Sequence, residues 1–183
     1  MRKVTLLTAA TASIAVALAT ATSASAATSG TTTATITLSG GSLAITVPSG
    51  SVSLGSGAAA DSISGQLGSV TVTDNRAALG GTWTSSVSSN NWANNTVTSA
   101  ASIDNSRVDY WSGLATASSG VAVTVPGQAT AVNKVALGAP ATAFAATATT
   151  GNNSTTWNPT LTVNAPAQAI AGAYSGTITH SVS

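Results

Sequence analysis

Side chains able to do acid–base, nucleophilic or metal chemistry are scarce in this chain. Its 183 residues include one His, four Asp (Asp61, Asp74, Asp104 and Asp109), no Glu and no Cys. Asp104 and Asp109 are five residues apart, so they would face opposite sides of a continuous strand. No nucleophile elbow, zinc-protease helix or phosphate-binding loop motif occurs. We therefore expect no enzyme, with no catalytic residue, no metal ligand and no cofactor.

His180 and the segment at residues 102–109 are the two remaining candidates for such chemistry. His180 has the same strand parity as Tyr174, Ile178 and Val182, which favours a core or core-edge histidine whose ring nitrogens find backbone hydrogen-bond partners. Residues 102–109 carry oxygen ligands of the kind calcium accepts. They lack the Gly and the terminal Glu of a helix–loop–helix calcium site, so a solvated loop is favoured and calcium binding stays open.

The four Trp stand out because the chain has few aromatic residues. Trp83 and Trp157 lie in alternating runs and are expected in the core. Trp92 and Trp111 lie among Asn, Ser and Gly, where an exposed ring can stack on a sugar while amides bond its hydroxyls. The alternative is that each ring plugs one end of a folded domain. The candidate binding residues are Trp92, Trp111, Asn91 and Asn94.

Polar and apolar residues alternate with a period of two along the chain, which is typical of half-buried strands. Gly-, Pro- and Asn-rich turn signals separate the runs. We predict an all-β fold, an Ig-like antiparallel β-sandwich. Two Ala-rich segments, residues 58–64 and 129–146, could hold a helical turn. The alternating runs cover residues 33–38, 43–47, 70–73, 83–88, 121–125, 157–164 and 174–182.

Residues 1–26 have the order of a signal peptide. A basic start at Arg2 and Lys3 precedes an uncharged apolar stretch, and Ala24-Ser25-Ala26 is a small-x-small cleavage site. We expect a signal-peptide helix at 1–26, a flexible N-terminus with a possible first strand at 27–40, and one sandwich domain at 41–183. No later apolar run has spanning length, so we expect a secreted protein with no integral membrane segment after processing.

Charged residues make up only 5% of the chain, and the formal net charge is +1. So small a charge gives no electrostatic attraction to nucleic acid, and we expect no nucleic-acid partner. Without Cys, no disulfide can support the secreted domain, which must depend on its apolar core.

Several motifs together resemble the WxL-domain surface proteins of Gram-positive bacteria. They are residues 71–76 (TVTDNR) followed by 81–84 (GTWT), then 157–163 (WNPTLTV) and 171–179 (AGAYSGTIT). Neither Trp-x-Leu motif is intact: Trp83-Thr84-Ser85 keeps only Trp, and His180-Ser181-Val182 stands where the second would be. The inward parity of Trp83 and His180 makes a structural role the expectation for the family-motif positions. These positions are Asp74, Asn75, Arg76, Trp83, Trp157 and His180.

The resemblance implies a secreted cell-surface protein held non-covalently at the cell wall through peptidoglycan, with a structural or interaction role. The partners would be peptidoglycan or another cell-wall glycan, and other surface proteins. Two alternatives remain at this point: a carbohydrate-binding module for a free polysaccharide, and a fimbrial or matrix subunit that assembles by strand pairing.

Overall fold

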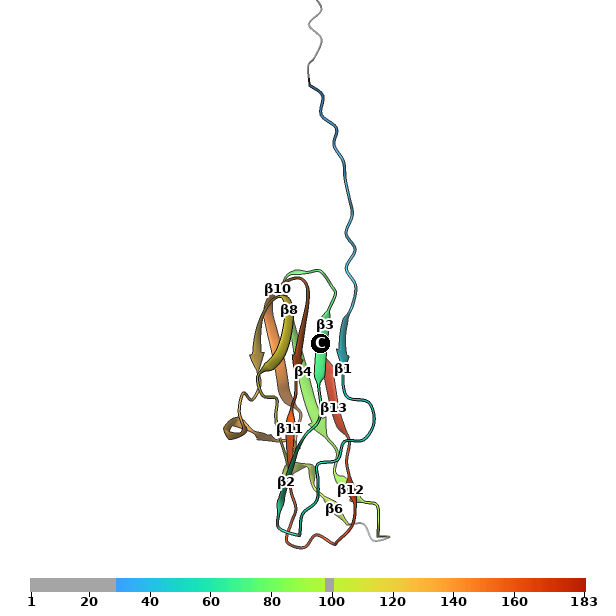
Figure 1. Ribbon diagram of the computed structural model, residues 1–183, viewed down its shortest axis with the longest axis vertical. Helices are drawn as coiled ribbons and strands as arrows, with labels where there is room; N and C mark the ends of the chain where they lie inside the picture. Colours follow the sequence, from blue (N-terminus) through green and yellow to red (C-terminus); the bar gives the residue numbers. More distant parts are fainter. Residues whose placement is uncertain (1–28, 98–100) are drawn as a thin grey trace, which may run out of the picture. The chain divides into compact units, whose positions relative to one another are not determined.

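The computed structural model describes residues 29–97 and 101–183, and in this part of the chain the all-β prediction is confirmed (Figure 1). The only helical elements in these residues are two 3₁₀ turns, η1 (Asn105–Arg107) and η2 (Ala131–Asn133). Every strand and 3₁₀ turn of the described residues lies in the compact unit Leu38–Ser183. The expected signal peptide, residues 1–26, lies outside the described residues.

In the described part of the chain, thirteen strands form three antiparallel sheets. The first has the order β1-β3-β10-β4-β13, with β8 also paired to β10. The second has the order β2-β11-β7-β9, and the third β12-β5-β6. The first sheet contains β1 (Leu43–Thr46), β3 (Val70–Asp74), β4 (Leu79–Ser89), β8 (Ala115–Pro126), β10 (Ala141–Trp157) and β13 (Ile178–Val182). The other two contain β2 (Ser62–Gln66), β5 (Trp92–Asn94), β6 (Ser102–Ile103), β7 (Val108–Trp111), β9 (Val135–Ala136), β11 (Thr160–Asn164) and β12 (Tyr174–Ser175).

Strand β10 folds back on itself. The rings of Phe144 and Trp157 stack with their centroids 4.9 Å apart, whereas thirteen residues of straight strand would separate them by about 40 Å. The reversal lies near Ala148 (φ 52°) and Gly151 (φ 65°), where the pairing register shifts. The first part of β10 pairs with β4 and its last part pairs with β3, so this one strand contributes to both layers of a sandwich.

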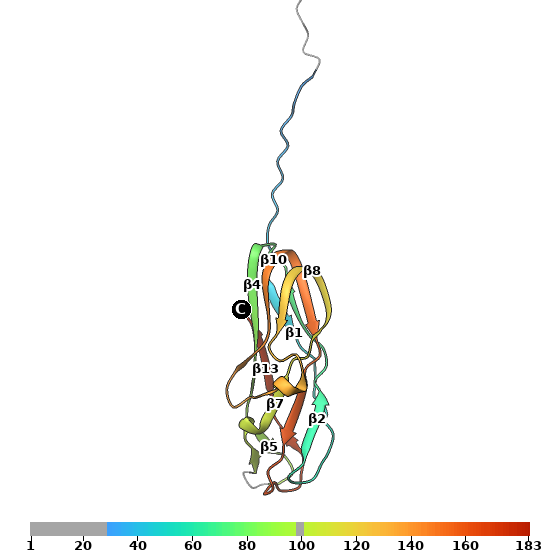
Figure 2. The same ribbon diagram turned by 90° about the vertical axis from the view of Figure 1, so that its left-hand side faces the viewer.

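Strand β8 follows β10 around the same bend, and Figure 2 shows the two strands arching together over one end of the domain. Gly120 lies at this bend with φ 73°. A Cβ at this position would overlap the backbone carbonyl oxygen of Asn152, so only Gly allows the two strands to approach so closely.

The core lies between the two layers and follows the predicted alternation. Val70 and Val72 on β3 face inward, as do Trp83 and Val87 on β4. Thr71, Thr84 and Ser86 on the opposite face are less buried, which is the pattern of a sheet with one face on the core. The largest fully buried side chains are Trp83, Trp157, Tyr110, Phe144, Leu137 and Leu161.

Four details of the sequence reading are wrong. Residues 33–38 form no strand, because alternation defines two faces but supplies no neighbouring backbone, and this run pairs with none of the described strands. The run 157–164 is interrupted before β11 at Asn158-Pro159, since Pro has no N–H for the ladder. The run 174–182 is interrupted between β12 and β13. The Ala-rich residues 58–64 form no helical turn, and residues 62–64 belong to β2, where β11 supplies hydrogen bonds. The other Ala-rich segment, 129–146, does hold a helical turn, η2, before residues 141–146 join β10.

A membrane-spanning helix would need both length and apolar character, and no helix within residues 29–97 and 101–183 has them.

The close packing at the β8–β10 bend leads to a stability prediction. Gly120→Ala should lower the free energy of unfolding by several kcal/mol, because the added Cβ overlaps backbone. Gly80→Ala is the matched control: Gly80 has φ 70° and open space around it, so only the backbone cost of about 1–2 kcal/mol applies. Urea denaturation measures both variants, and equal losses would contradict this account of the bend.

Candidate functional site

The family-motif positions at the turn between β3 and β4 form a hydrogen-bonded cluster. Arg76 Nε and Nη2 donate to the Asp74 carboxylate at 2.9 and 3.0 Å, and Nη2 also donates to the Thr82 carbonyl at 2.8 Å. Asn153 Nδ2 lies 3.5 Å from Asp74 Oδ2, and Trp83 Nε1 donates to Asn153 Oδ1 at 3.4 Å. These bonds fix the turn beside the β10 reversal.

Asp74 is almost fully buried and stays a carboxylate because of this cluster. The hydrogen bonds from Arg76 hold the pKa of Asp74 below its ordinary value, against the effect of burial. Asn75 contributes through its backbone, accepting from Gly41 N and donating to Ser42 O. The Asp74 carboxylate and the Trp83 N–H bond within the fold, and none of the residues of this cluster lines a depression described below.

Trp157 and His180, the other family-motif positions, meet in a second cluster around Tyr110. The Tyr110 hydroxyl lies 3.2 Å from His180 Nε2 and accepts from Trp157 Nε1 at 3.2 Å. The ring centroids of Trp157 and His180 are 6.5 Å apart. Burial lowers the pKa of His180 to about 4, so the imidazole is neutral at pH 7. The partner of His180 is thus a buried phenol in place of the expected backbone group.

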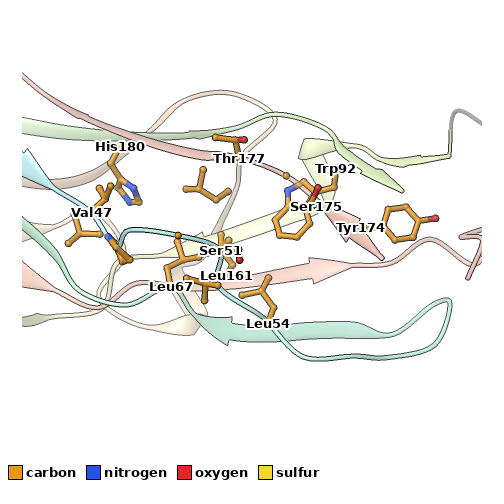
Figure 3. Close-up of a pocket in the computed structure, with 16 residues that line it drawn as sticks. Val47, Ser51, Leu54, Leu67, Trp92, Leu161, Tyr174, Ser175, Thr177 and His180 are labelled. Carbon is orange, nitrogen blue, oxygen red and sulfur yellow. The ribbon is translucent and has the colours of Figure 1, made fainter. Parts of the chain in front are cut away.

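A depression of about 320 Å³ opens beside His180 (Figure 3). His180 and Val47 lie at one end in this view and Tyr174 lies at the other. Trp92, Ser175 and Thr177 lie along one side, opposite Leu54, Leu67 and Leu161. The loop that follows β1 supplies one wall, and β5, β12 and β13 supply the other.

A second depression, of about 770 Å³, adjoins the first. The two share four lining residues: Val52, Leu54, Trp92 and Tyr174. We call the two depressions together the aromatic groove. Its remaining walls come from residues 53–59 and 169–173 and from the ends of β2, β6 and β11.

Trp92 and Tyr174 are held in place by local contacts. Trp92 Nε1 donates to Ser89 Oγ at 3.2 Å, and Gly176 lies directly against the indole ring, where a Cβ would overlap it. The Tyr174 hydroxyl donates to the Ile170 carbonyl at 2.9 Å. Both rings are only half-buried, so each keeps a surface facing the groove.

No charged side chain lines the aromatic groove as far as the structure describes it. The lining is mainly Val, Leu, Ile, Ala, Gly and the two aromatic rings, with hydroxyls from Ser51, Ser175 and Thr177. Such a surface favours an uncharged ligand with apolar faces, which aromatic rings can contact and hydroxyls can orient.

The four candidate binding residues do not form one site. Trp92 lines the groove, whereas Trp111, half-buried at the end of β7, lines neither depression. Asn94 is buried and bonded within the fold: its Oδ1 accepts from Thr96 N and Val97 N, and its Nδ2 donates to the Ile170 carbonyl. Asn91 Oδ1 accepts from Asn105 N. Only Trp92 of the four has a surface toward the groove.

The Asp104–Asp109 segment uses its two carboxylates separately. Asp104 caps η1 by accepting from Ser106 N at 2.9 Å. Asp109 pairs with Lys134 at 2.8 Å and accepts from Asn164 Nδ2 at 3.0 Å. Across residues 29–97 and 101–183, no three potential His or carboxylate metal ligands come together.

Sequence reasoning missed Tyr174 and the loop at residues 47–59 as parts of the site. Tyr174 was assigned to the apolar face of the last run, which is correct, but that face continues past the core into the groove. The useful signal is Gly176, two residues later, because a Gly within an expected strand marks a close approach by another group. In the structure it lies between β12 and β13, against Trp92.

Comparison of the chain with family models, curated proteins and solved structures finds no match. The resemblance to WxL-domain surface proteins therefore depends on the quoted motifs alone.

The neutral His180 makes the stability of the fold depend on pH. The unfolded His takes a proton near pH 6.5 and the folded one near pH 4, so stability is complete above about pH 6.5 and decreases as the pH falls toward 4. Between pH 7 and pH 4.5 the free energy of unfolding should fall by roughly 2–3 kcal/mol.

His180→Gln should remove this dependence, and urea denaturation of both proteins at the two pH values measures it. Asp74 does not interfere with this measurement. Because its pKa is lowered from 3.8, its contribution to stability is nearly complete at pH 4.5 and is lost mainly below pH 3.8. A wild-type protein with the same stability at pH 7 and pH 4.5 would show that His180 is not held neutral.

Proposed function

We propose that this is a secreted, non-enzymatic surface protein that associates non-covalently with the cell wall by binding a glycan strand of peptidoglycan in the aromatic groove. The observation that carries the proposal is that Trp92 and Tyr174 are shared by two adjoining depressions with no charged lining. The signal-peptide pattern of residues 1–26 supports export, and the motifs that resemble WxL-domain proteins support a wall location.

The chemistry of a sugar strand suits this lining. One face of a pyranose ring is rich in C–H groups, and it packs on an aromatic ring in the way other apolar groups do. The hydroxyls at the ring edge need neutral hydrogen-bond partners, which Ser175 and Thr177 provide beside Trp92. Two successive depressions with aromatic rings between them suit a ligand longer than one sugar.

A free polysaccharide would use the same contacts, so it is the second candidate. The two differ in the polymer that is bound: an insoluble wall fraction in the first case and a soluble glycan in the second. Neither polymer would be bound through ionic contacts, because charged side chains are absent from the described lining of the groove and scarce in the chain.

A sedimentation assay with purified peptidoglycan sacculi tests the proposal. The protein should pellet with sacculi, and binding should change little up to about 1 M salt, where the screening length is about 3 Å. Trp92→Ala should weaken binding about tenfold or more, since covering a large aromatic side chain contributes roughly 1.5–3 kcal/mol.

Trp111→Ala is the matched control, because Trp111 is also half-buried but lines neither depression. It should bind as the wild type does, and melting curves show whether each variant is folded. Equal losses in both variants, or a steep loss of binding with salt, would refute the groove as the binding site. Binding to soluble glycans but not to sacculi would favour the second candidate.

A further inference from the structure

The outer half of β8 carries an apolar stripe that faces solvent. Val121, Val123 and Val125 are 61%, 58% and 53% exposed, whereas the residues between them, Ala122 and Thr124, are turned inward. The sequence predicted this strand correctly, but its larger apolar side chains point away from the core. An exposed row of Val on a sheet is a surface that burial would stabilise, by about 25 cal/mol for each Å² removed from water.

The backbone of β8 is also unpaired along one edge. Among the described strands β8 pairs only with β10, so the N–H and C=O groups on its other edge face outward. Proteins usually protect such an edge with charged side chains or with a cover. Strand β8 has no charged residue in its twelve positions, and its protection is limited to the bend at Gly120 and Pro126 at its end.

Residues 33–38 have the complementary properties. They alternate Thr with Ala34, Ile36 and Leu38, and they pair with no described strand. Ile36 and Leu38 are each 86% exposed. This segment therefore has the sequence pattern of a strand but pairs with no other described strand. Strand β8, in turn, has one edge to which a further strand could bond.

We propose that residues 33–38 of one copy of this protein add as an antiparallel strand to the outer edge of β8 in a second copy. In the register that matches the apolar faces, Ala34 lies opposite Val125, Ile36 opposite Val123 and Leu38 opposite Val121. The Thr side chains then fall on the face of Ala122 and Thr124. Both segments are uncharged, so no repulsion opposes the contact.

A second copy is favoured over pairing within one copy because of the short connection. Four residues lie between Leu38 and the start of β1 at Leu43, and the five residue steps from Leu38 to Leu43 span about 17 Å when fully extended. In one layer, β3 and the last part of β10 separate β1 from the first half of β8, and Val121–Val125 follow the first part of β10 into the facing layer. A strand added beyond them therefore lies four strand spacings sideways, about 19 Å, and one layer, about 10 Å, from β1. Because each copy both donates a strand and offers an edge, the contact is heterologous and can extend into a chain of copies.

Cysteine cross-linking tests the proposed contact directly, because the chain has no native Cys. Protein that retains residues 27–183 is prepared as the single variants Ile36→Cys and Val123→Cys, and the two are mixed under oxidising conditions. The expected product is a covalent dimer that joins position 36 of one variant to position 123 of the other, identified by peptide mass. Val132→Cys is the control partner, since Val132 is 94% exposed on η2 and outside the contact.

Sedimentation of the cysteine-free protein gives an independent measurement. Association should increase with protein concentration, and Val123→Lys or Ile36→Lys should weaken it about tenfold or more, whereas Val132→Lys should leave it unchanged. A protein that stays monomeric at all concentrations without 36–123 cross-links would overturn the proposal. So would a double variant, Ile36→Cys with Val123→Cys, that closes its disulfide within one monomer. Neither assay contains wall material, so failure here leaves the groove proposal intact.

Discussion

The reversal of β10 is the constraint on which the rest of the fold depends. By folding back, one strand pairs with β4 in one layer and with β3 in the other, and it brings Phe144 onto Trp157 in the core. The Asp74–Arg76 cluster holds the neighbouring turn, and β8 follows the bend on the outside. In a domain without disulfides, a continuous backbone through both layers supplies a connection that side-chain packing alone would not.

Local pattern predicted the all-β class and the inward residues of β3 and β4 correctly, because alternation depends only on which face meets the core. Trp83, Trp157 and His180 were placed inward for this reason. The pattern fails on β8, where Val121, Val123 and Val125 face solvent. Pattern could not predict strand partners. The sequence therefore favours a strand at residues 33–38, which pair with no described strand, and allows a helical turn at residues 58–64, of which 62–64 pair with β11. Nor could it find the groove, which exists only because the loop after β1 lies opposite β12 and β13.

The two proposals use separate parts of the domain and similar chemistry. The groove is lined by the loop after β1 and by β5, β12 and β13, whereas the assembly contact uses β8 and residues 33–38. Both surfaces are apolar and uncharged, so both interactions are expected to persist in salt. A chain of copies would present one groove for each copy. Once one groove holds the polymer, the others meet it at a high local concentration, so the assembly would bind the polymer more tightly than a single copy does.

The scarcity of basic side chains has a consequence for proteolysis. After residue 28 the chain contains only Arg76, Arg107 and Lys134, the residues that trypsin-like enzymes recognise. Arg76 is bonded to Asp74 and Thr82, Lys134 is paired with Asp109, and Arg107 closes a 3₁₀ turn with its carbonyl bonded to Asn164. Each cleavage point is thus part of hydrogen-bonded structure, and a protease of this class would need the domain to open locally before it could cut.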